Sequence, residues 1–221
     1  MLISHRHRFI YTKTFKTAGT SVESYFEPLC MAPGEWLLSH ERAQTVSEHG
    51  VIGFRGADQP ADVQWWNHMP AALIRERAGD DVWRNYFKFC VVRNPFDRAI
   101  SAFYFARAKG RLPASTDSDA LQFEHWLAGG GLRLDREQYT LDGRFALDDV
   151  VRYEHLHADL ARVCQRLGVA WQPERLPSFK AGIRPQGAAP LFTRRAEALV
   201  RQLCAFEIEC FGYAATAELA A

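Results

Sequence analysis

The chain has 221 residues, of which 48% are hydrophobic, and this is enough to bury the core of one domain spanning residues 1–221. Lys and Arg number 27 against 26 Asp and Glu, so the net charge is +1. A general nucleic-acid binder would carry a clear basic excess, so this balance argues against one. Positive charge is nevertheless concentrated locally, because the first twenty residues hold no acid and four basic residues: Arg6, Arg8, Lys13 and Lys16.

The five cysteines are scattered and form no Cys-x-x-Cys pair. This pattern argues against a disulfide framework or a structural zinc site and favours buried thiols in a reducing compartment. The N-terminal residues lack the apolar stretch of a signal peptide, and no run of 18 apolar residues occurs. We therefore expect a soluble, cytoplasmic protein without an integral membrane segment, and its oligomeric state is left open.

Predicted strands and helices alternate along the chain. The strands are expected at residues 8–12, 51–54, 87–92 and 149–153, and the helices at 18–27, 70–77, 94–110, 120–127, 154–167 and 193–211. Strand–loop–helix units thus recur three times, which predicts an α/β fold with a parallel sheet flanked by helices. Ligands of such sheets bind beyond the C-terminal ends of the strands.

The first motif follows the first predicted strand and reads Phe-Lys-Thr-Ala-Gly-Thr-Ser over residues 15–21. Small residues let the backbone approach an anion closely, and N–H groups at a helix start donate to it. Lys16 adds a positive charge, so the segment is typical of a phosphate-binding loop. It is not the NTPase loop G-x-x-x-x-G-K-[ST], because Lys16 precedes Gly19. The alternative is an ordinary helix start with a solvated lysine.

The second motif follows the predicted strand at 87–92. Arg93 ends this buried strand, Asn94 is placed to cap the next helix, and Ser101 lies two helical turns further along. A buried arginine is costly unless it is paired. Its partner is either a phosphate group of a ligand or Asp97, and the second possibility would make the motif purely structural.

The two motifs together resemble those of the sulfotransferases. Residues 16–21 look like their 5′-phosphosulfate loop, and residues 93–98 with Ser101 look like their 3′-phosphate motif. The resemblance is strongest to the sulfotransferase 2 family, which includes Golgi carbohydrate sulfotransferases and many bacterial members. Residues 68–71, 153–156 and 210–213 resemble weaker family segments. Two features depart from the pattern, since Phe15 stands where the family usually has proline and we expect no Golgi anchor.

The resemblance implies a P-loop-type parallel sheet and the sulfuryl donor 3′-phosphoadenosine 5′-phosphosulfate (PAPS), used without a metal. In this family Lys16 would meet the sulfate and its bridging oxygen. The 5′-phosphate would be held by four further residues of the loop: Thr17, Gly19, Thr20 and Ser21.

The resemblance also assigns residues to the 3′-phosphate, the group that distinguishes this donor from ATP. Arg93 and Ser101 would bind it. A late basic loop would complete the pocket through Lys180 and Arg184, unless that loop is simply a solvated turn.

Two residues are candidates for the base that takes the proton of the acceptor. His68 has an ordinary pKa near 6.5 and follows Trp65 and Trp66, which could form a wall for a sugar. The alternative for His68 is a helix-capping or surface role. Glu23 is the rival, because related families place a catalytic glutamate near this point, but it could equally be a favourable charge in the first turn of a helix.

These observations predict a sulfotransferase that moves a sulfuryl group from PAPS to a hydroxyl of a carbohydrate acceptor and releases 3′-phosphoadenosine 5′-phosphate (PAP). Two alternatives are a nucleotide-dependent kinase on the same fold and a non-catalytic nucleotide-binding module. The missing Gly-Lys-[Ser/Thr] sequence disfavours the kinase. Two phosphate motifs beside a candidate base favour an enzyme over a binding module.

Overall fold

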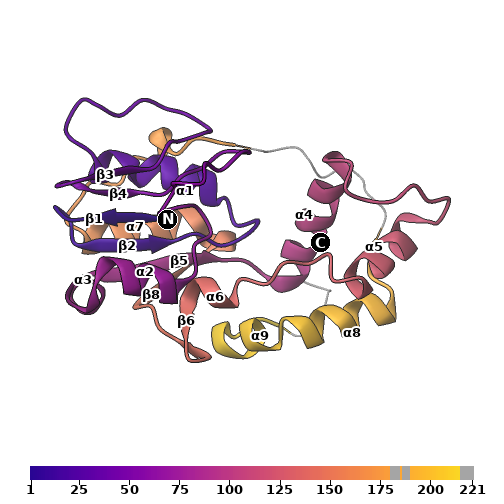
Figure 1. Cartoon of the computed structure of the whole chain (residues 1–221). Coiled ribbons are helices and arrows are strands. Elements are labelled where there is room, and N and C mark those ends of the chain that lie inside the picture. The colour runs from indigo at the N-terminus through magenta and orange to yellow at the C-terminus, as the bar shows by residue number, and fades with distance from the viewer. Residues whose placement is uncertain (180–184, 186–189, 215–221) are drawn as a thin grey trace. The chain divides into compact units, whose positions relative to one another are not determined.

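A computed structural model describes residues 1–179, 185 and 190–214 (Figure 1). The chain divides into two compact units. The first, here called the sheet unit, comprises Met1–Val92 and Asp135–Phe179. The second, here called the helical unit, comprises Arg93–Leu134 and Lys180–Ala221.

A six-stranded sheet of order β3-β4-β1-β2-β5-β8 forms the sheet unit (Figure 1). Its central strands run parallel, as predicted: β2 (Phe9–Thr12), β5 (Phe87–Val92) and β8 (Asp149–Arg152). Three short strands extend it with antiparallel pairing: β1 (Leu2–Ser4), β3 (Thr45–Ser47) and β4 (Gly50–Ile52). The α/β class is therefore confirmed, but the sheet is mixed. Strands of three residues are too short to show a periodic pattern, which explains why β1 and β3 escape prediction.

Helices cover both faces of the sheet. On one face, α1 (Gly19–Phe26) and α7 (Leu156–Arg166) bury apolar side chains against alternate residues of β2 and β5, including Phe9 and Phe89. Successive strand side chains point to opposite faces, so Lys88 reaches the other face, where its ammonium lies 5.7 Å from the ring of Trp83. That face carries two short helices, α2 (Ala71–Ala78) and α3 (Asp80–Asn85).

Short elements complete the sheet unit. They are the helix α6 (Arg136–Tyr139), the paired strands β6 (Thr140–Leu141) and β7 (Arg144–Phe145), and three single 3₁₀ turns at Glu27–Cys30, Tyr153–His155 and Pro173–Arg175.

The helical unit packs four helices around an aromatic core. These are α4 (Pro95–Ala108), α5 (Asp119–Ala128), α8 (Arg194–Leu203) and α9 (Ala205–Phe211). The cap predicted for α4 is confirmed, because the Asn94 side chain accepts a hydrogen bond from the Phe96 N–H at 2.9 Å. The prediction of one helix over 193–211 is wrong. Cys204 has φ −107° and ψ 25°, values outside the helical range, and it separates α8 from α9.

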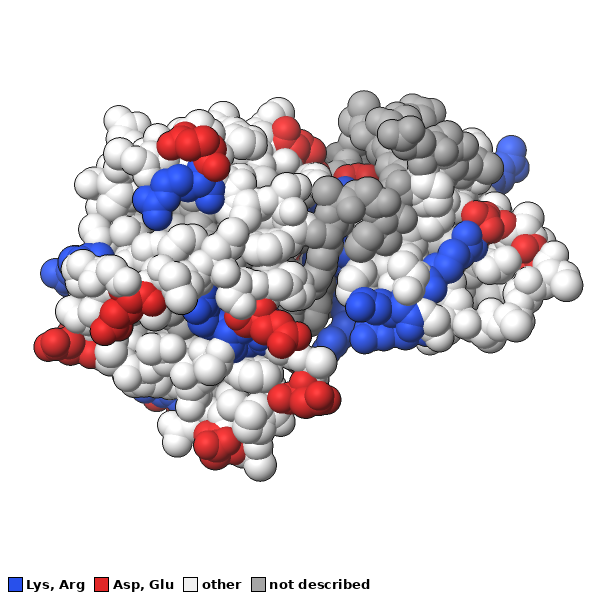
Figure 2. All heavy atoms as spheres, turned by 90° about the horizontal axis from the view of Figure 1, so that it is seen from above, with Lys and Arg blue, Asp and Glu red and all other residues white. Residues whose placement is uncertain are grey.

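Three further features of the structure bear on the expectations drawn from the sequence. No helix among the described residues is long and apolar enough to cross a membrane. On the face drawn in Figure 2, basic and acidic side chains occur in small groups separated by uncharged surface. Each of the five cysteines is a free thiol; four are buried as predicted, and Cys210 is exposed.

Candidate active site

The predicted phosphate-binding motif at residues 15–21 lies just beyond the C-terminal end of β2, and residues 13–21 together are here called the donor loop. Its backbone is unusual, because Lys16 and Ala18 adopt left-handed conformations with φ of 62° and 57°. Such conformations cost a non-glycine residue about 1–2 kcal/mol. Alternation between left- and right-handed residues turns successive N–H groups toward one point and forms an anion-binding nest. The strain is therefore consistent with a loop shaped for an anion.

The start of α1 adds a second feature that favours an anion. Its N-cap residue is Ala18, which carries no side-chain oxygen, and no side chain caps this helix. Side chains cap α4, α5 and α8, whereas α2, α3, α6, α7 and α9 share the lack of a side-chain cap with α1. Uncapped N–H groups at a helix start, together with the positive end of the helix dipole, bind phosphate groups well.

The hydroxyl groups of the loop have different surroundings. Thr17 is buried, and its Oγ1 lies 2.7 Å from Thr14 Oγ1, so this side chain braces the loop from within. Thr20 Oγ1 accepts a hydrogen bond from Lys13 Nζ at 3.3 Å. Ser21 Oγ accepts one from the Phe179 N–H at 3.3 Å, which ties the start of α1 to the end of the described late segment.

Lys13 is a functional candidate that the sequence analysis noted only as a local charge. It is 3% exposed, and its stem runs under the donor loop. A Cβ atom added at Gly19 would lie 2.8 Å from Lys13 Cγ and 3.0 Å from Lys13 Cε. Gly19 thus has a steric reason to be glycine, separate from contact with a phosphate: it leaves room for the lysine stem.

We expect Gly19→Ala to destabilise the protein by about 1–3 kcal/mol, the usual cost of overpacking a buried site. The lysine cannot easily move aside, because its Nζ lies 2.6 Å from Glu23 Oε2. Ala18→Gly, one residue earlier, relieves a left-handed conformation and should be neutral or stabilising. Urea denaturation of both variants checks this pair, and equal stabilities would contradict it.

Glu23, the rival base, lies at the centre of a buried ion-pair network and is 1% exposed. Its carboxylate oxygens lie 2.6 Å from Lys13 Nζ, 2.9 Å from Arg55 Nη1 and 2.5 Å from the Met1 ammonium nitrogen. Burial on its own would raise the pKa of Glu23, but these cations hold the pKa well below its ordinary value of 4.5. Glu23 belongs to the second turn of α1 rather than to the first turn, where a dipole-stabilising charge would lie.

His68 lies close to the donor loop and is held from several sides. Its Nδ1 lies 3.1 Å from the backbone oxygen of Lys13, and its ring stacks on Phe15 with centroids 4.0 Å apart and planes 12° apart. Its own backbone oxygen accepts a hydrogen bond from Gln138 Nε2 at 3.0 Å. The residue adopts a left-handed conformation with φ of 57°, so its position is fixed by contacts rather than by local preference.

These contacts determine the protonation of His68. A carbonyl oxygen can only accept, so Nδ1 carries the proton and Nε2 keeps its lone pair. Burial, together with the positive charge of Lys13, lowers the pKa of His68 to about 3. His68 is therefore neutral at physiological pH, with Nε2 as the nitrogen that can accept a proton.

Phe15 also explains how the loop departs from the usual family pattern. Its backbone N–H donates to the buried Asp135 Oδ1 at 2.6 Å. Proline has no N–H group, so this anchor requires another residue at position 15. Asp135 and Gln138 follow a long stretch without motifs, and the sequence carries no signal for either contact.

The two tryptophans before His68, considered above as a wall for a sugar, differ in their exposure. Trp65 is 7% exposed and belongs to the core. Trp66 is half-buried, and the Arg77 guanidinium lies 5.3 Å from the centre of its ring.

Arg93 and Ser101, the predicted 3′-phosphate residues, belong to the helical unit. Arg93 directly follows β5, and its Nε and Nη2 both lie 2.6 Å from Asp97 Oδ2, so the structural pair considered above is formed. Ser101 is half-buried on α4. The remaining two predicted residues, Lys180 and Arg184, lie outside the described residues.

Comparison with known proteins places the chain in a family. The model of the sulfotransferase family matches residues 1–210, so the chain belongs to the sulfotransferase family and is a transferase. An uncharacterised protein of Archaeoglobus fulgidus is 28% identical over 113 residues, which cover 49% of this chain and 87% of the archaeal protein. No solved structure matches the chain significantly.

Proposed function

We propose that this sulfotransferase moves the sulfuryl group of PAPS to a hydroxyl of a carbohydrate acceptor and releases PAP. The observation that carries the proposal is the donor loop, where left-handed Lys16 and Ala18 lead into the uncapped start of α1 beside a neutral His68. The carbohydrate acceptor rests on the resemblance to carbohydrate sulfotransferases. A cytoplasmic location is part of the same proposal and agrees with the free thiols.

On the donor side, the N–H groups of the nest and of the first turn of α1 hold the 5′-phosphate. The hydroxyl groups of Thr20 and Ser21 donate further hydrogen bonds to it, while Thr17 mainly shapes the loop through its contact with Thr14. Lys16 meets the bridging oxygen, and its positive charge stabilises the negative charge that develops there as the sulfuryl group leaves.

On the 3′ side, Arg93 and Ser101 bind the 3′-phosphate, and Lys180 and Arg184 complete that contact. The Arg93–Asp97 pair is compatible with this role, because a guanidinium carries five N–H donors and can contact a carboxylate and a phosphate at the same time.

On the acceptor side, His68 is the base. Its Nε2 takes the proton of the acceptor hydroxyl while the hydroxyl oxygen forms a bond to sulfur. At the same time the bond between sulfur and the bridging oxygen breaks, and PAP leaves with that oxygen. Glu23 is poorly suited to this task, since it is 1% exposed and three cations occupy its carboxylate oxygens.

The donor is tested by ligand-induced stabilisation. PAP at one hundred times its dissociation constant should add about 2.7 kcal/mol to the free energy of unfolding, whereas ATP and AMP should add much less. A thermal-shift series at matched magnesium and ionic strength measures the difference. Equal shifts for ATP and PAP would refute recognition of the 3′-phosphate and favour a kinase.

A further inference from the structure

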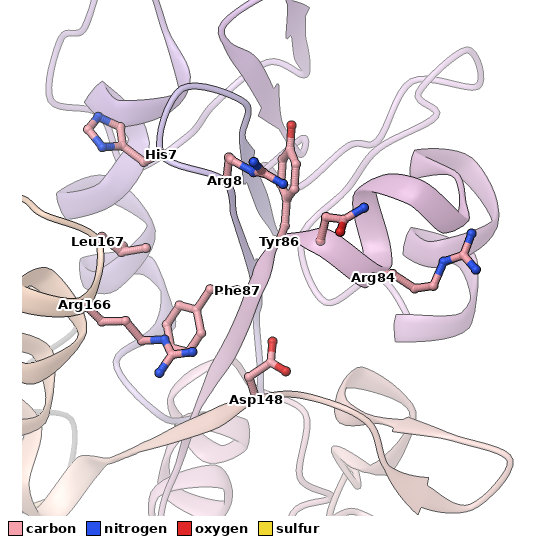
Figure 3. A pocket seen from close by; sticks show the side chains of 9 residues that line it. His7, Arg8, Arg84, Tyr86, Phe87, Asp148, Arg166 and Leu167 are labelled. Atoms are coloured by element: carbon pink, nitrogen blue, oxygen red, sulfur yellow. The ribbon is translucent and has the colours of Figure 1, made fainter.

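A second cationic site lies in the sheet unit at the opposite end of the parallel strands. Phe9 pairs with Phe87 where β2 and β5 begin, and the donor loop follows Thr12, where β2 ends. A strand of four residues spans about 13 Å, so the two ends of β2 are separate places. A pocket of about 310 Å³ opens at the beginning of these strands (Figure 3). Its lining includes Arg8, Arg84, Arg166, Tyr86, Phe87 and Asp148.

Two of these arginines lie on aromatic rings. The Arg8 guanidinium carbon lies 5.8 Å from the centre of the Tyr86 ring, and that of Arg166 lies 4.4 Å from the centre of the Phe87 ring. Figure 3 shows them on two sides of the pocket, with Phe87 between them. A guanidinium above an aromatic ring keeps its charge and N–H donors, which can bind an oxyanion.

The positive charge of this pocket is not balanced by its acidic residue. Asp148 Oδ2 lies 2.8 Å from Lys88 Nζ and also accepts a hydrogen bond from the Lys88 N–H at 2.7 Å. Within the described part of the chain, neither Arg8 nor Arg166 forms an ion pair. Arg84 differs from both, because its Nε donates to the Asp80 backbone oxygen at 3.2 Å and its side chain projects away from Phe87 (Figure 3).

The backbone gives no reason for an arginine at position 8. Arg8 lies in the turn between β1 and β2 with φ of 51°, a conformation that favours glycine or asparagine. Its backbone oxygen accepts a hydrogen bond from the Phe87 N–H at 2.9 Å, and any residue could provide this contact. The side chain of Arg8 therefore needs an explanation other than local structure.

We propose that this pocket binds an oxyanion, a sulfate or phosphate group, carried by a ligand of about monosaccharide size. Guanidinium groups bind such oxyanions through paired N–H donors. The volume lies at the small end of ligand pockets, which span about 300–1,000 Å³. The site is distinct from the donor loop, and its existence does not depend on the function proposed above.

Isothermal titration with glucose 6-sulfate tests this site, with inorganic sulfate and unmodified glucose as further ligands at constant ionic strength. We expect saturable binding of the sugar sulfate and none of glucose. Arg8→Gln and Arg166→Gln should each weaken the affinity about tenfold, as expected for loss of a charge-assisted hydrogen bond. Arg84→Gln is the matched control and should change the affinity less than about twofold.

Equal affinities for inorganic sulfate and the sugar sulfate would show that the oxyanion alone is recognised, and tighter binding of the sugar sulfate would show that the sugar contributes.

A parallel titration of Lys16→Ala separates this pocket from the donor loop. Saturable binding of glucose 6-sulfate that persists in Lys16→Ala, and that is weakened when Arg166→Gln is added to this variant, is the expected result. Binding that is lost in Lys16→Ala but retained in both Arg8→Gln and Arg166→Gln would overturn the proposal, as would the absence of saturable binding. Arg8 and Arg166 are both exposed, so we expect the Arg8→Gln and Arg166→Gln variants to fold. Their melting temperatures check this expectation.

Discussion

Replacing His68 by alanine is expected to lower turnover about a hundred- to ten-thousandfold, the range typical for loss of a general base. The affinity for PAP should change little, because His68 acts on the acceptor rather than on the donor. The Nδ1 contact with the Lys13 backbone oxygen leaves Nε2 as the accepting nitrogen, and the variant removes that lone pair. Steady-state kinetics and PAP titration of the same preparation measure the two quantities.

His68→Asn is the matched control for a structural role. Asparagine tolerates the left-handed backbone conformation of this position and still carries an N–H donor, but it is not a base. We expect it to fold as well as the wild type and to be as inactive as His68→Ala. Turnover near the wild-type rate in either folded variant would contradict the assignment of His68 as the base.

The structure also changes the pH dependence expected from the sequence. An ordinary histidine would make the rate rise with pH through about 6.5. Because burial lowers the pKa of His68 to about 3, the residue is already deprotonated at pH 5. The rate should therefore be independent of His68 ionisation from about pH 5 upward, and a step near 6.5 that vanishes in His68→Asn would show that its pKa is ordinary.

Glu23→Gln should destabilise the protein by about 3–5 kcal/mol, since removing one partner of a buried ion pair leaves the other charges uncompensated. The charges left behind are Lys13, Arg55 and the Met1 ammonium group. Glu48→Gln is the surface control, because the side chain of Glu48 is 88% exposed, and it should change stability by less than about 0.5 kcal/mol. Urea denaturation at neutral pH measures both.

The direction of the pKa shift sets the pH range of this effect. The pKa of Glu23 is lower in the folded protein, so its ion pairs contribute fully above its ordinary pKa of 4.5. The contribution is lost as the pH falls further below that value. The wild type should therefore lose more stability than Glu23→Gln on acidification from pH 5 to pH 3. Parallel losses in the two proteins would show that Glu23 is not held by these cations.

Local sequence signals were sufficient for the main elements of the fold. The β-branched and aromatic run of residues 87–92 predicted β5 with its observed bounds, and Asn94 followed by proline predicted the start of α4. The positions of Gly19 and Lys16 after an apolar strand located the donor loop. Each of these signals lies within a few residues of the structure that it specifies.

Contacts between residues distant in sequence could not be predicted in this way. Arg55 meets Glu23 from 32 residues away, and Asp135 meets the Phe15 N–H from 120 residues away. The low pKa of His68 depends on burial and on Lys13, neither of which its neighbours in sequence reveal. The sequence therefore predicted a loop after β2 and a histidine near it, but not the network that sets their charges.

Transfer of a radiolabelled sulfuryl group tests the central claim most directly. The protein is incubated with ³⁵S-labelled PAPS and a panel of mono- and oligosaccharides, and in parallel with γ-³²P-labelled ATP and the same panel. We predict labelled product from PAPS with at least one sugar, its loss in His68→Asn, and no product from ATP. Phosphorylated sugars from ATP, with none sulfated from PAPS, would contradict a PAPS-dependent sulfotransferase.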